Sequence, residues 1–245
     1  MSGQCVVHRL GLLPYQEAWE LQNRLAAEIA AGERPPTLLL LEHPHTYTFG
    51  RRGQKRHLLW DENELSRRGV SVHWVDRGGD ITYHGPGQLV GYPLLPLLPG
   101  GLHAGSPRQE NELPTPHLPR ADYIGYLRRL EKTLILALDR LGLTSSQIDG
   151  LTGVWVQPDP CLPAAKIAAI GVKVDVRGVS LHGFALNVNP DMSYWQGIVA
   201  CGLADYPAAS LAGLLDQPPT MEQVMESVVS AFGEVFDYQM VSDTV

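Results

Sequence analysis

The chain has 245 residues, of which 44% are hydrophobic and 18% charged, and this composition indicates a globular protein long enough to bury a sizeable core. The net charge of −7 argues against broad binding to nucleic acid, which requires a basic face. Residues 5–9 are too short and too polar for the apolar part of an export signal, and the uncharged run 89–102 is too short and too rich in proline to span a bilayer. We therefore expect neither export nor membrane association.

The number and spacing of the cysteines indicate the redox environment of the protein. The chain has three cysteines, Cys5, Cys161 and Cys201, and no two of them form a Cys-x-x-Cys pair. They are too few for a disulfide framework. A reducing, cytoplasmic environment is the natural inference.

The N-terminal part of the chain predicts a helix and then a strand. A proline at position 14, apolar residues at helical spacing and a glycine at position 32 indicate a helix over 14–32. Residues 37–41 are apolar on both faces, which is typical of a buried strand. The basic loop 50–56 that follows has two interpretations: a solvated face, or a docking patch for an acidic partner or a phosphate.

A short helix and another strand are expected next. Asp61 is predicted to cap the helix, Glu64 to complete a capping box, and Gly69 to end the helix. Residues 71–76 predict a strand that leads into a glycine-rich stretch.

The glycine-rich stretch, residues 77–88, reads Arg-Gly-Gly-Asp-Ile-Thr-Tyr-His-Gly-Pro-Gly-Gln. Gly78 and Gly79 leave backbone amides uncovered by a Cβ, which suits close approach of a ligand. The residues that follow have strand propensity, so Thr82 and His84 should share one face of a short strand that ends in a tight turn. The alternative is a glycine-rich hairpin with a buried, hydrogen-bonded histidine.

An irregular segment and a long helix come after this stretch. Residues 96–120 have no periodicity and contain several prolines and glycines, which predicts a flexible insert within a single domain over 1–245. Asp122 predicts the cap of a helix that ends at Gly142. Its inner side is expected to consist of Ile124, Leu127, Leu134, Leu138 and Leu141.

The remaining elements predict a strand over 153–156, a hairpin and two helices. Alternating residues indicate that the first hairpin strand runs from 166 to about 177 and the second over 179–189. A short helix is expected near 210–215, and Thr220 with Gln223 predicts a capped last helix. Because helices and strands do not alternate regularly, the fold class is α+β, with a mixed or antiparallel sheet flanked by helices.

Cys201 and Lys166 are the candidates for chemistry. A cysteine needs a nearby positive charge or base to react as a thiolate, and Gly202 leaves the amide after Cys201 open to an oxyanion. Lys166 begins an apolar run, so its ammonium could point inward and stabilise such a thiolate. The alternatives are an inert buried cysteine and a strand-end lysine whose ammonium reaches solvent.

Metal and phosphate-loop chemistry are not expected. His43 and His45 are held apart by a proline, and no carboxylate or cysteine stands at ligand spacing from them or from His84 and His182. Neither G-x-x-x-x-G-K-[ST] nor G-x-G-x-x-G is present.

Four segments together resemble the lipoyl(octanoyl) transferase family. They are residues 77–93, 166–174, 182–189 and 201–203, which occur in the order and approximate spacing of that family. Including 50–53, the likeness covers roughly residues 10–235, and several motifs in agreement are more specific than any single one. One departure is Ala200, where the family usually has a proline.

The resemblance implies a fold shared with biotin and lipoate protein ligases, and transfer of an octanoyl group from octanoyl-acyl carrier protein to a lysine of a lipoyl domain. The acceptors it implies are the lipoyl domains of 2-oxoacid dehydrogenases or the glycine cleavage H protein, and it implies no cofactor. Cys201 would carry the acyl group as a thioester, and Lys166 would lower the pKa of Cys201. The substrate site that the resemblance implies consists of Arg77, Gly78, Gly79, Asp80, Ile81, Thr82, Tyr83, His84, Ala169, Ile170, Gly171, Gly183, Phe184 and Ala185.

The chemistry of these residues agrees with that activity, and two alternatives stay open. A thioester donor needs no ATP, and covalent catalysis divides the transfer into two easier steps. Flat walls lined by glycine suit an eight-carbon acyl chain whose only polar end is the carbonyl. The alternatives are an ATP-dependent lipoate or biotin protein ligase on the same scaffold, and a non-catalytic module that binds the acyl group or its carrier.

Overall fold

The computed structural model describes residues 3–97, 122–157, 161, 163–200 and 206–242. Cys201 and most of the predicted insert 96–120 lie outside the described residues. Within the described part of the chain, no helix is long and apolar enough to cross a membrane.

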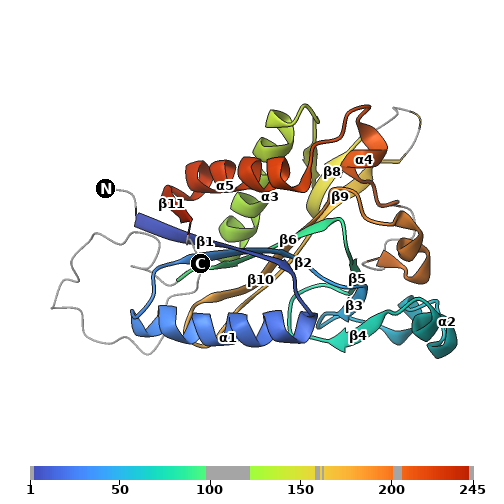
Figure 1. Cartoon of the computed structure of the whole chain (residues 1–245), viewed down its shortest axis with the longest axis horizontal. Coiled ribbons are helices and arrows are strands. Elements are labelled where there is room, and N and C mark those ends of the chain that lie inside the picture. The colour runs from blue at the N-terminus through green and yellow to red at the C-terminus, as the bar shows by residue number, and fades with distance from the viewer. Residues whose placement is uncertain (1–2, 98–121, 158–160, 162, 201–205, 243–245) are drawn as a thin grey trace.

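A large sheet forms the framework of the described residues (Figure 1). Its eight strands are β1 (Gly3–Leu12), β2 (Thr37–Glu42), β6 (Gln88–Leu94), β7 (Ser146–Ile148), β8 (Leu151–Val156), β9 (Ala165–Val174), β10 (Ser180–Asn187) and β11 (Tyr238–Ser242). They are hydrogen-bonded in the order β11-β1-β2-β6-β10-β9-β8-β7. β1 runs parallel to β11 and β2, and the other pairs are antiparallel, so the predicted mixed sheet is confirmed.

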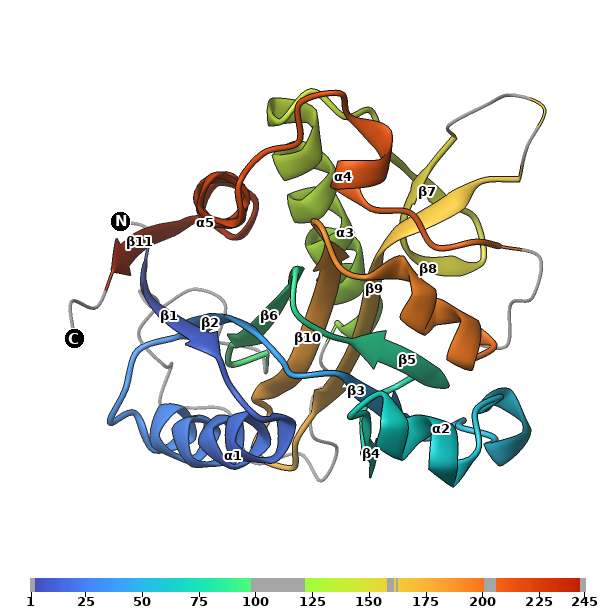
Figure 2. The same ribbon diagram turned by 45° about the vertical axis from the view of Figure 1, so that its right-hand side comes forward.

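Helices cover both faces of the large sheet (Figure 2). They are α1 (Tyr15–Ala31), α3 (Tyr123–Arg140) and α5 (Met221–Phe236). Leu39 and Leu41 of β2 pack in one apolar cluster with α1, whereas Leu38 and Leu40 pack in another with α3 and α5. This alternation explains why β2 is apolar on both faces, as the sequence predicts.

A second, smaller sheet lies beside the first. It consists of β3 (Thr46–Phe49), β4 (Ser71–Trp74) and β5 (Ile81–His84), in the order β4-β3-β5. The short elements are η1 (Lys55–His57), α2 (Glu62–Arg67), η2 (Met192–Gly197) and α4 (Leu211–Leu214). A third apolar cluster joins this sheet to η2, which fixes β5 and its glycine-rich flanks against the rest of the protein.

The N-terminal caps of α3 and α5 agree with the prediction. The Asp122 side chain accepts a hydrogen bond from Gly125 N at 2.8 Å. Thr220 and Gln223 form the reciprocal capping box at the start of α5. At α2, Asp61 caps the helix as predicted, but the Glu64 carboxylate binds the side chains of Arg67 and Arg68, so the predicted capping box there is wrong.

Two further expectations are wrong. Ile124 is 72% exposed, because it lies two positions, roughly 200° around the helix, from Tyr126, the first residue of the buried stripe of α3. The first hairpin strand ends at Val174, and Val176 is fully exposed in the turn. The Asp175 carboxylate accepts hydrogen bonds from the backbone of Arg177 and Val179, which stabilises the turn at that point.

Candidate active site

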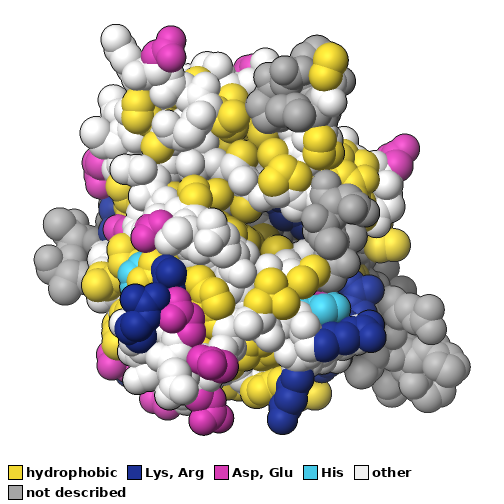
Figure 3. Space-filling view, turned by 90° about the vertical axis from the view of Figure 1, so that its right-hand side faces the viewer, with side chains coloured by type: hydrophobic (Ala, Val, Ile, Leu, Met, Phe, Trp, Pro, Cys, Tyr) yellow, Lys and Arg dark blue, Asp and Glu magenta, His cyan; other side chains and the backbone are white. Residues whose placement is uncertain are grey.

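Three cavities meet at Ala169 on β9. The large cavity has a volume of about 650 Å³ and the narrow cavity about 50 Å³, and a small cavity lies between Lys166 and Ala200. Figure 3 shows hydrophobic side chains around a hollow in this face, with Lys and Arg side chains below it on both sides. Ala169 lines all three cavities, so they lie next to one another around the middle of β9.

The described lining residues are as follows. The large cavity is lined by Arg52, Gln54, Arg56, His57, Gly78, Gly79, Asp80, Tyr123, Leu127, Gly150, Leu151, Thr152, Lys166, Ala169, Ile170, Gly171 and Val172. The narrow cavity is lined by Tyr15, Arg77, Gly78, Gly79, Thr82, His84, Tyr92, Ala169, Ile170, Gly171, His182, Gly183, Phe184 and Ala185. The small cavity is lined by Trp155, Lys166, Ala169, Ala185, Asn187, Trp195, Ala200, Tyr206 and Ala208.

The glycine-rich stretch forms one wall of these cavities. Thr82 and His84 face the narrow cavity together, as the alternation of β5 predicts. Ile81 and Tyr83, which the resemblance includes in the substrate site, instead pack in the third apolar cluster on the other face of the strand. Arg77 is buried, and its guanidinium donates to Thr48 O at 2.6 Å and to Gly78 O at 2.9 Å, so it fixes the conformation of this wall.

β9 and β10 form the opposite wall. Gly171 pairs with Gly183, and Ala169 with Ala185, so four small residues face each other in the ladder. A Cβ on Gly91 of the neighbouring strand would lie 2.1 Å from Phe184 Cζ, which shows that the Phe184 ring lies directly over Gly91. Small side chains on this wall leave room for a chain-like ligand, and Phe184 also lines the narrow cavity.

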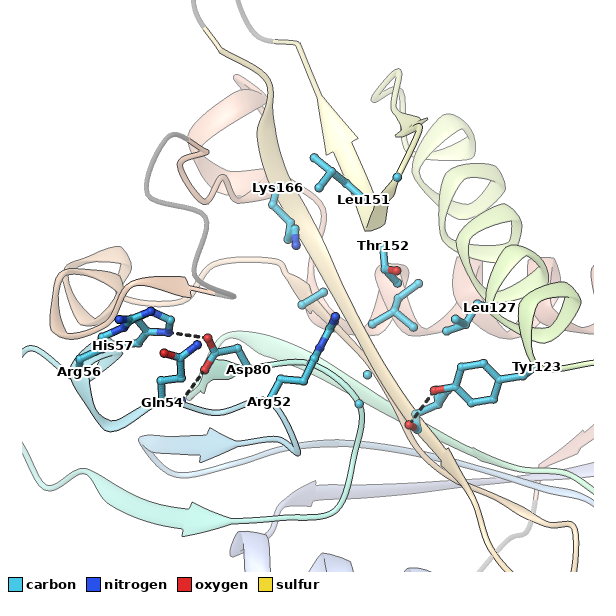
Figure 4. Close-up of a pocket in the computed structure, with 17 residues that line it drawn as sticks. Arg52, Gln54, Arg56, His57, Asp80, Tyr123, Leu127, Leu151, Thr152 and Lys166 are labelled. Atoms are coloured by element: carbon cyan, nitrogen blue, oxygen red, sulfur yellow. Dashed lines mark hydrogen bonds and ion pairs between the residues drawn. The ribbon is translucent and has the colours of Figure 1, made fainter.

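Lys166 lies near the start of β9, where it lines both the large and the small cavity. Its Nζ is 4.5 Å from the centre of the Trp155 ring, a cation–π contact. Gly153 permits this position, because a Cβ there would meet Ala168 O at 2.7 Å and the Lys166 Cε at 3.4 Å. The ammonium is therefore directed along the cavity wall (Figure 4).

The chain on either side of Cys201 is held by hydrogen bonds to these same walls. Before it, Val199 N donates to His57 O at 2.8 Å, and Leu59 N donates to Gly197 O at 2.8 Å. After it, Lys166 N donates to Pro207 O at 2.8 Å, and Ala209 N donates to Lys166 O at 2.9 Å. Cys201 itself is not among the described residues.

Asn187 connects the second of these flanking segments to the glycine-rich stretch. Its Nδ2 donates to Ala209 O at 2.9 Å, and its Oδ1 accepts from Gln88 Nε2 at 2.9 Å. Gln88 Oε1 in turn binds His84 Nδ1 at 2.9 Å. This buried chain of side chains relates the position of residues 206–209 to the narrow cavity.

The narrow cavity is more polar than the sequence predicts, because Tyr15, Tyr92 and His182 also line it. His182 Nε2 is 2.9 Å from Asp76 Oδ1, and the residue has a positive φ of 58°. Burial lowers the pKa of His182, and the Asp76 carboxylate opposes that effect. Burial also holds the pKa of His84 well below its ordinary value, so this histidine is neutral.

One hydroxyl in the narrow cavity is unsatisfied. Thr82 is only 6% exposed, and its Oγ1 has no hydrogen-bond partner among the described residues. Tyr15 and Tyr92 come from elements distant in sequence, so no local pattern could have identified them. His182 had a signal, since it directly precedes the residues 183–185 implied by the resemblance.

The large cavity carries charge on one side and an aromatic residue on the other (Figure 4). Arg52 and Arg56 come from the basic loop, and Tyr123 from the start of α3 donates to Val172 O at 3.1 Å. Asp80 and His57 form a hydrogen-bonded pair on the same side as the arginines. In the described part of the chain, no group of three or more His, Cys, Asp or Glu side chains is arranged to hold a metal ion.

The protein shares its fold with lipoate protein ligases. It matches a bi-partite lipoate protein ligase from Thermoplasma acidophilum with a TM-score of 0.69 and 17% identity, over 100% of this chain and 88% of that chain. Lipoate-protein ligase A bound with ATP matches with a TM-score of 0.63 and 16% identity, over 100% of this chain and 90% of that chain. At these identities the likeness shows a common fold.

The chain belongs to the lipoyl protein ligase A/B catalytic domain family, whose profile matches residues 14–233. It is 44% identical over 230 residues to an octanoyltransferase of Chloroflexus aurantiacus, which is 94% of this chain and 93% of the relative. It is 37% identical over 252 residues to an octanoyltransferase of Cytophaga hutchinsonii, which is 98% of this chain and 95% of the relative. The family resemblance stated from the sequence motifs is confirmed.

Proposed function

We propose that the protein is an octanoyltransferase of protein lipoylation, which moves an octanoyl group from octanoyl-acyl carrier protein to a lysine of a lipoyl domain. Cys201 holds the group as a thioester between the two steps. The names of the relatives, at 37–44% identity over most of the chain, support octanoyl transfer. The contacts around the cavities support the roles of individual residues.

The observation that carries this proposal is the way the chain is held on either side of Cys201. Val199, two residues before it, is bonded to His57, and Pro207, six residues after it, is bonded to Lys166. Two residues of extended chain span at most about 7 Å, so covalent geometry limits how far Cys201 can lie from Val199. Ala200 and Tyr206, which bracket the segment, both line the small cavity with Lys166.

In this proposal each cavity has a task. The narrow cavity takes the acyl chain, which packs against the small residues of β9 and β10. The ammonium of Lys166 stabilises the thiolate of Cys201. The large cavity admits the phosphopantetheine arm of the donor and then the lysine of the acceptor, since it is wide and adjoins Lys166.

The partners follow from this chemistry. Arg52 and Arg56 line the large cavity and suit the phosphate of the donor arm or the acidic surface of its carrier. The acceptors are lipoyl domains of 2-oxoacid dehydrogenases or the glycine cleavage H protein. A cytoplasmic location would keep the Cys201 thiol reduced.

Intact-mass measurement tests the proposal. Protein mixed with octanoyl-acyl carrier protein in the absence of ATP should gain the mass of one octanoyl group, and Cys201→Ser should not. No gain, or a gain that persists in Cys201→Ser, would refute the covalent step.

Two other results would point elsewhere. Pyrophosphate release from lipoate and ATP would indicate a ligase on this scaffold. Carrier-protein binding without turnover, together with no pH dependence of Cys201 labelling by iodoacetamide, would indicate a binding module.

A further inference from the structure

A β-bulge directly follows Lys166 in β9. Val154 of β8 pairs with Ala168 of β9, but the next residue of β8, Trp155, pairs with Lys166. β9 therefore has one residue more than β8 at this point, and the extra residue is Ile167. A bulge of this kind changes which residues of a strand share a face.

The bulge decides which face of the sheet Lys166 occupies. Beyond the bulge, Ala168 and Val172 pack in the apolar cluster with α3 and α5, whereas Ala169 lines the cavities. If the strand alternated regularly, Lys166 would share the face of Ala168 and point into that cluster. Because of the extra residue, Ile167 packs in the cluster and Lys166 lines the cavities with Ala169.

Gly153 of β8 is matched to the bulge. It has a φ of 122°, and a Cβ on it would lie 2.7 Å from Ala168 O and 3.4 Å from Lys166 Cε. No side chain therefore fits at this position while the bulge is in place. The backbone N of Gly153 donates to Oε1 of Glu131, a residue of α3, at 3.0 Å.

Glu131 is a buried carboxylate, with a side chain only 1% exposed. Its Oε2 accepts from Arg128 Nη1 at 2.8 Å, on the same helix, so of its two hydrogen bonds among the described residues only the one to Gly153 N reaches the large sheet. Burying a carboxylate costs free energy unless it is hydrogen-bonded, and an apolar side chain of similar volume often replaces a buried ion pair without loss of stability. The bond to Gly153 thus points to a role of Glu131 in local geometry.

We propose, on the basis of the proposed function, that Glu131 is a positioning residue for Lys166. Its carboxylate fixes the backbone of β8 at Gly153, opposite the point where β9 bulges. The bulge turns Lys166 to the cavities and sets its ammonium against the Trp155 ring. Glu131 is not among the described residues that line the three cavities, so it acts through β8 and not on a substrate.

Two substitutions of similar size separate the hydrogen bond from the volume of the side chain. Glu131→Gln keeps an oxygen that accepts from Gly153 N, whereas Glu131→Met fills the same space without an acceptor. Thr133→Val is a matched control on α3. Thr133 is also fully buried, but its hydroxyl donates to Arg129 O within the helix, so its loss weakens α3 without affecting the bond to β8.

Nuclear magnetic resonance reports the position of Lys166 without any turnover. The chain has four lysines, so labelling with ¹³C-lysine gives few signals. The ring current of Trp155 should shift the Lys166 Hε resonances upfield, and the loss of that signal in Lys166→Met assigns it. In Glu131→Met the signal should move to the ordinary lysine position, and in Glu131→Gln and Thr133→Val it should stay shifted.

Steady-state transfer provides the second measurement. In Glu131→Met, kcat for octanoyl transfer should fall by roughly ten- to a hundredfold, because the amine is misplaced. KM for octanoyl-acyl carrier protein should be unchanged, because Glu131 is not among the described residues that line the donor cavity. Glu131→Gln and Thr133→Val should transfer at nearly the wild-type rate.

Gly153→Ala tests the same contact from the side of β8 and leaves Glu131 in place. Its Cβ cannot coexist with Ala168 O and the Lys166 stem, so this variant should show the same change of the Lys166 signal and the same fall in kcat. It also provides the test if Glu131→Met does not fold, which circular dichroism would show.

The outcomes are distinguishable. A Lys166 signal that keeps its wild-type position in folded Glu131→Met or Gly153→Ala, with or without slower transfer, would overturn the assignment of Glu131. Equal changes in Glu131→Gln or Thr133→Val would also overturn it. If wild type does not transfer octanoyl, the proposed function fails, and the resonance comparison still decides whether Glu131 positions Lys166.

Discussion

Lys166 illustrates how a single residue of β9 is adapted to the site. The sequence left open whether its ammonium turns inward or reaches out to solvent. Its Nζ lies against the Trp155 ring, and the residue lines two cavities. The glycine at position 153 provides the space for its stem.

We predict that Lys166→Ala raises the pH midpoint of Cys201 alkylation by iodoacetamide by roughly one to three units, because a nearby cation favours the thiolate. Octanoyl transfer should slow in parallel. Lys132→Ala on α3 is a matched control, since that lysine does not line the cavities. A midpoint that is the same in Lys166→Ala and wild type would show that Lys166 has only a structural role.

Asn187 supports the site through its hydrogen bonds to Gln88 and Ala209. Asn187→Ala would remove one acceptor of the buried Gln88 side-chain amide as well as the donor to the partly buried Ala209 carbonyl, and an unsatisfied buried group costs about 1–3 kcal/mol. We expect a loss of that size in the free energy of unfolding, measured in urea, together with slower transfer. Asn63→Ala on the exposed surface of α2 should change neither quantity. Unchanged stability in Asn187→Ala would contradict this role.

At the residue scale, local patterns predicted one strand face correctly and missed contacts between distant segments. The period of two along β5 was sufficient to put Thr82 and His84 in one cavity. It could not show that Tyr15 and Tyr92, from α1 and β6, complete that cavity, because their proximity depends on tertiary packing. Local patterns also could not show that His57 lies next to residues 197–199, because the bridge between Leu58 and Ile198 joins segments far apart in sequence.

At the scale of elements, the long helices were predictable, and several strands were not. α1 ends at Gly32 with φ of 76°, and α5 begins at its capping box, as local chemistry dictates. β1, β3, β6, β7 and β11 were missed. β1 and β11 lie at one edge of the large sheet, where exposed and buried residues mix without a clear alternation.

Hydrogen bonds hold the backbone of the basic loop, residues 50–56, in place. Gly50, Arg51 and Arg52 donate backbone hydrogen bonds to Asp80 O, Arg77 O and Gly79 O, respectively, at 3.0–3.2 Å. The loop backbone is therefore tied to the glycine-rich stretch, whereas the side chains of Arg51 and Arg52 remain exposed. Side-chain replacements should leave this backbone arrangement intact.

We predict that the double variant Arg51→Glu and Arg52→Glu raises the KM for octanoyl-acyl carrier protein by roughly two- to thirtyfold, the range for loss of two exposed ion pairs. The effect should weaken at high salt. Arg24→Glu, an exposed charge reversal on α1, should leave KM unchanged. An unaltered KM in the double variant would show that the loop does not meet the carrier.

At the scale of the whole molecule, a cluster of two buried histidines, His43 and His84, and the partly buried His73 joins α1 and the two sheets. The Tyr15 ring lies 5.1 Å from the ring of His43, 5.3 Å from that of His73 and 5.9 Å from that of His84. Burial lowers the pKa of His43 to about 4 and lowers that of His73 as well. His43 also binds Tyr92 OH at 2.8 Å, so the His43 ring is a neutral part of the core.

This cluster predicts acid sensitivity. Between about pH 6.5 and pH 4 a histidine of the unfolded chain binds a proton that buried His43 does not, so the free energy of unfolding must fall as the pH falls. His43 alone accounts for on the order of 3 kcal/mol across this range. Asp76, whose pKa is lowered chiefly by its hydrogen bond to His182, adds to the loss at still lower pH.

Urea unfolding at pH 7 and pH 5 measures this dependence. The midpoint should be clearly lower at pH 5, and His43→Gln should reduce the difference because one titrating group is removed. Equal midpoints at the two pH values would contradict the prediction.

All three cavities share Ala169 as a lining residue, so the proposed acyl site and the proposed entry site are adjacent. In the proposed function, the donor carrier protein and the acceptor domain both bring their reactive arms to the large cavity beside Lys166. We therefore expect the acyl carrier protein to dissociate, once it has given up its octanoyl group, before the lipoyl domain can bind. Excess carrier protein without an octanoyl group should then inhibit transfer to the lipoyl domain.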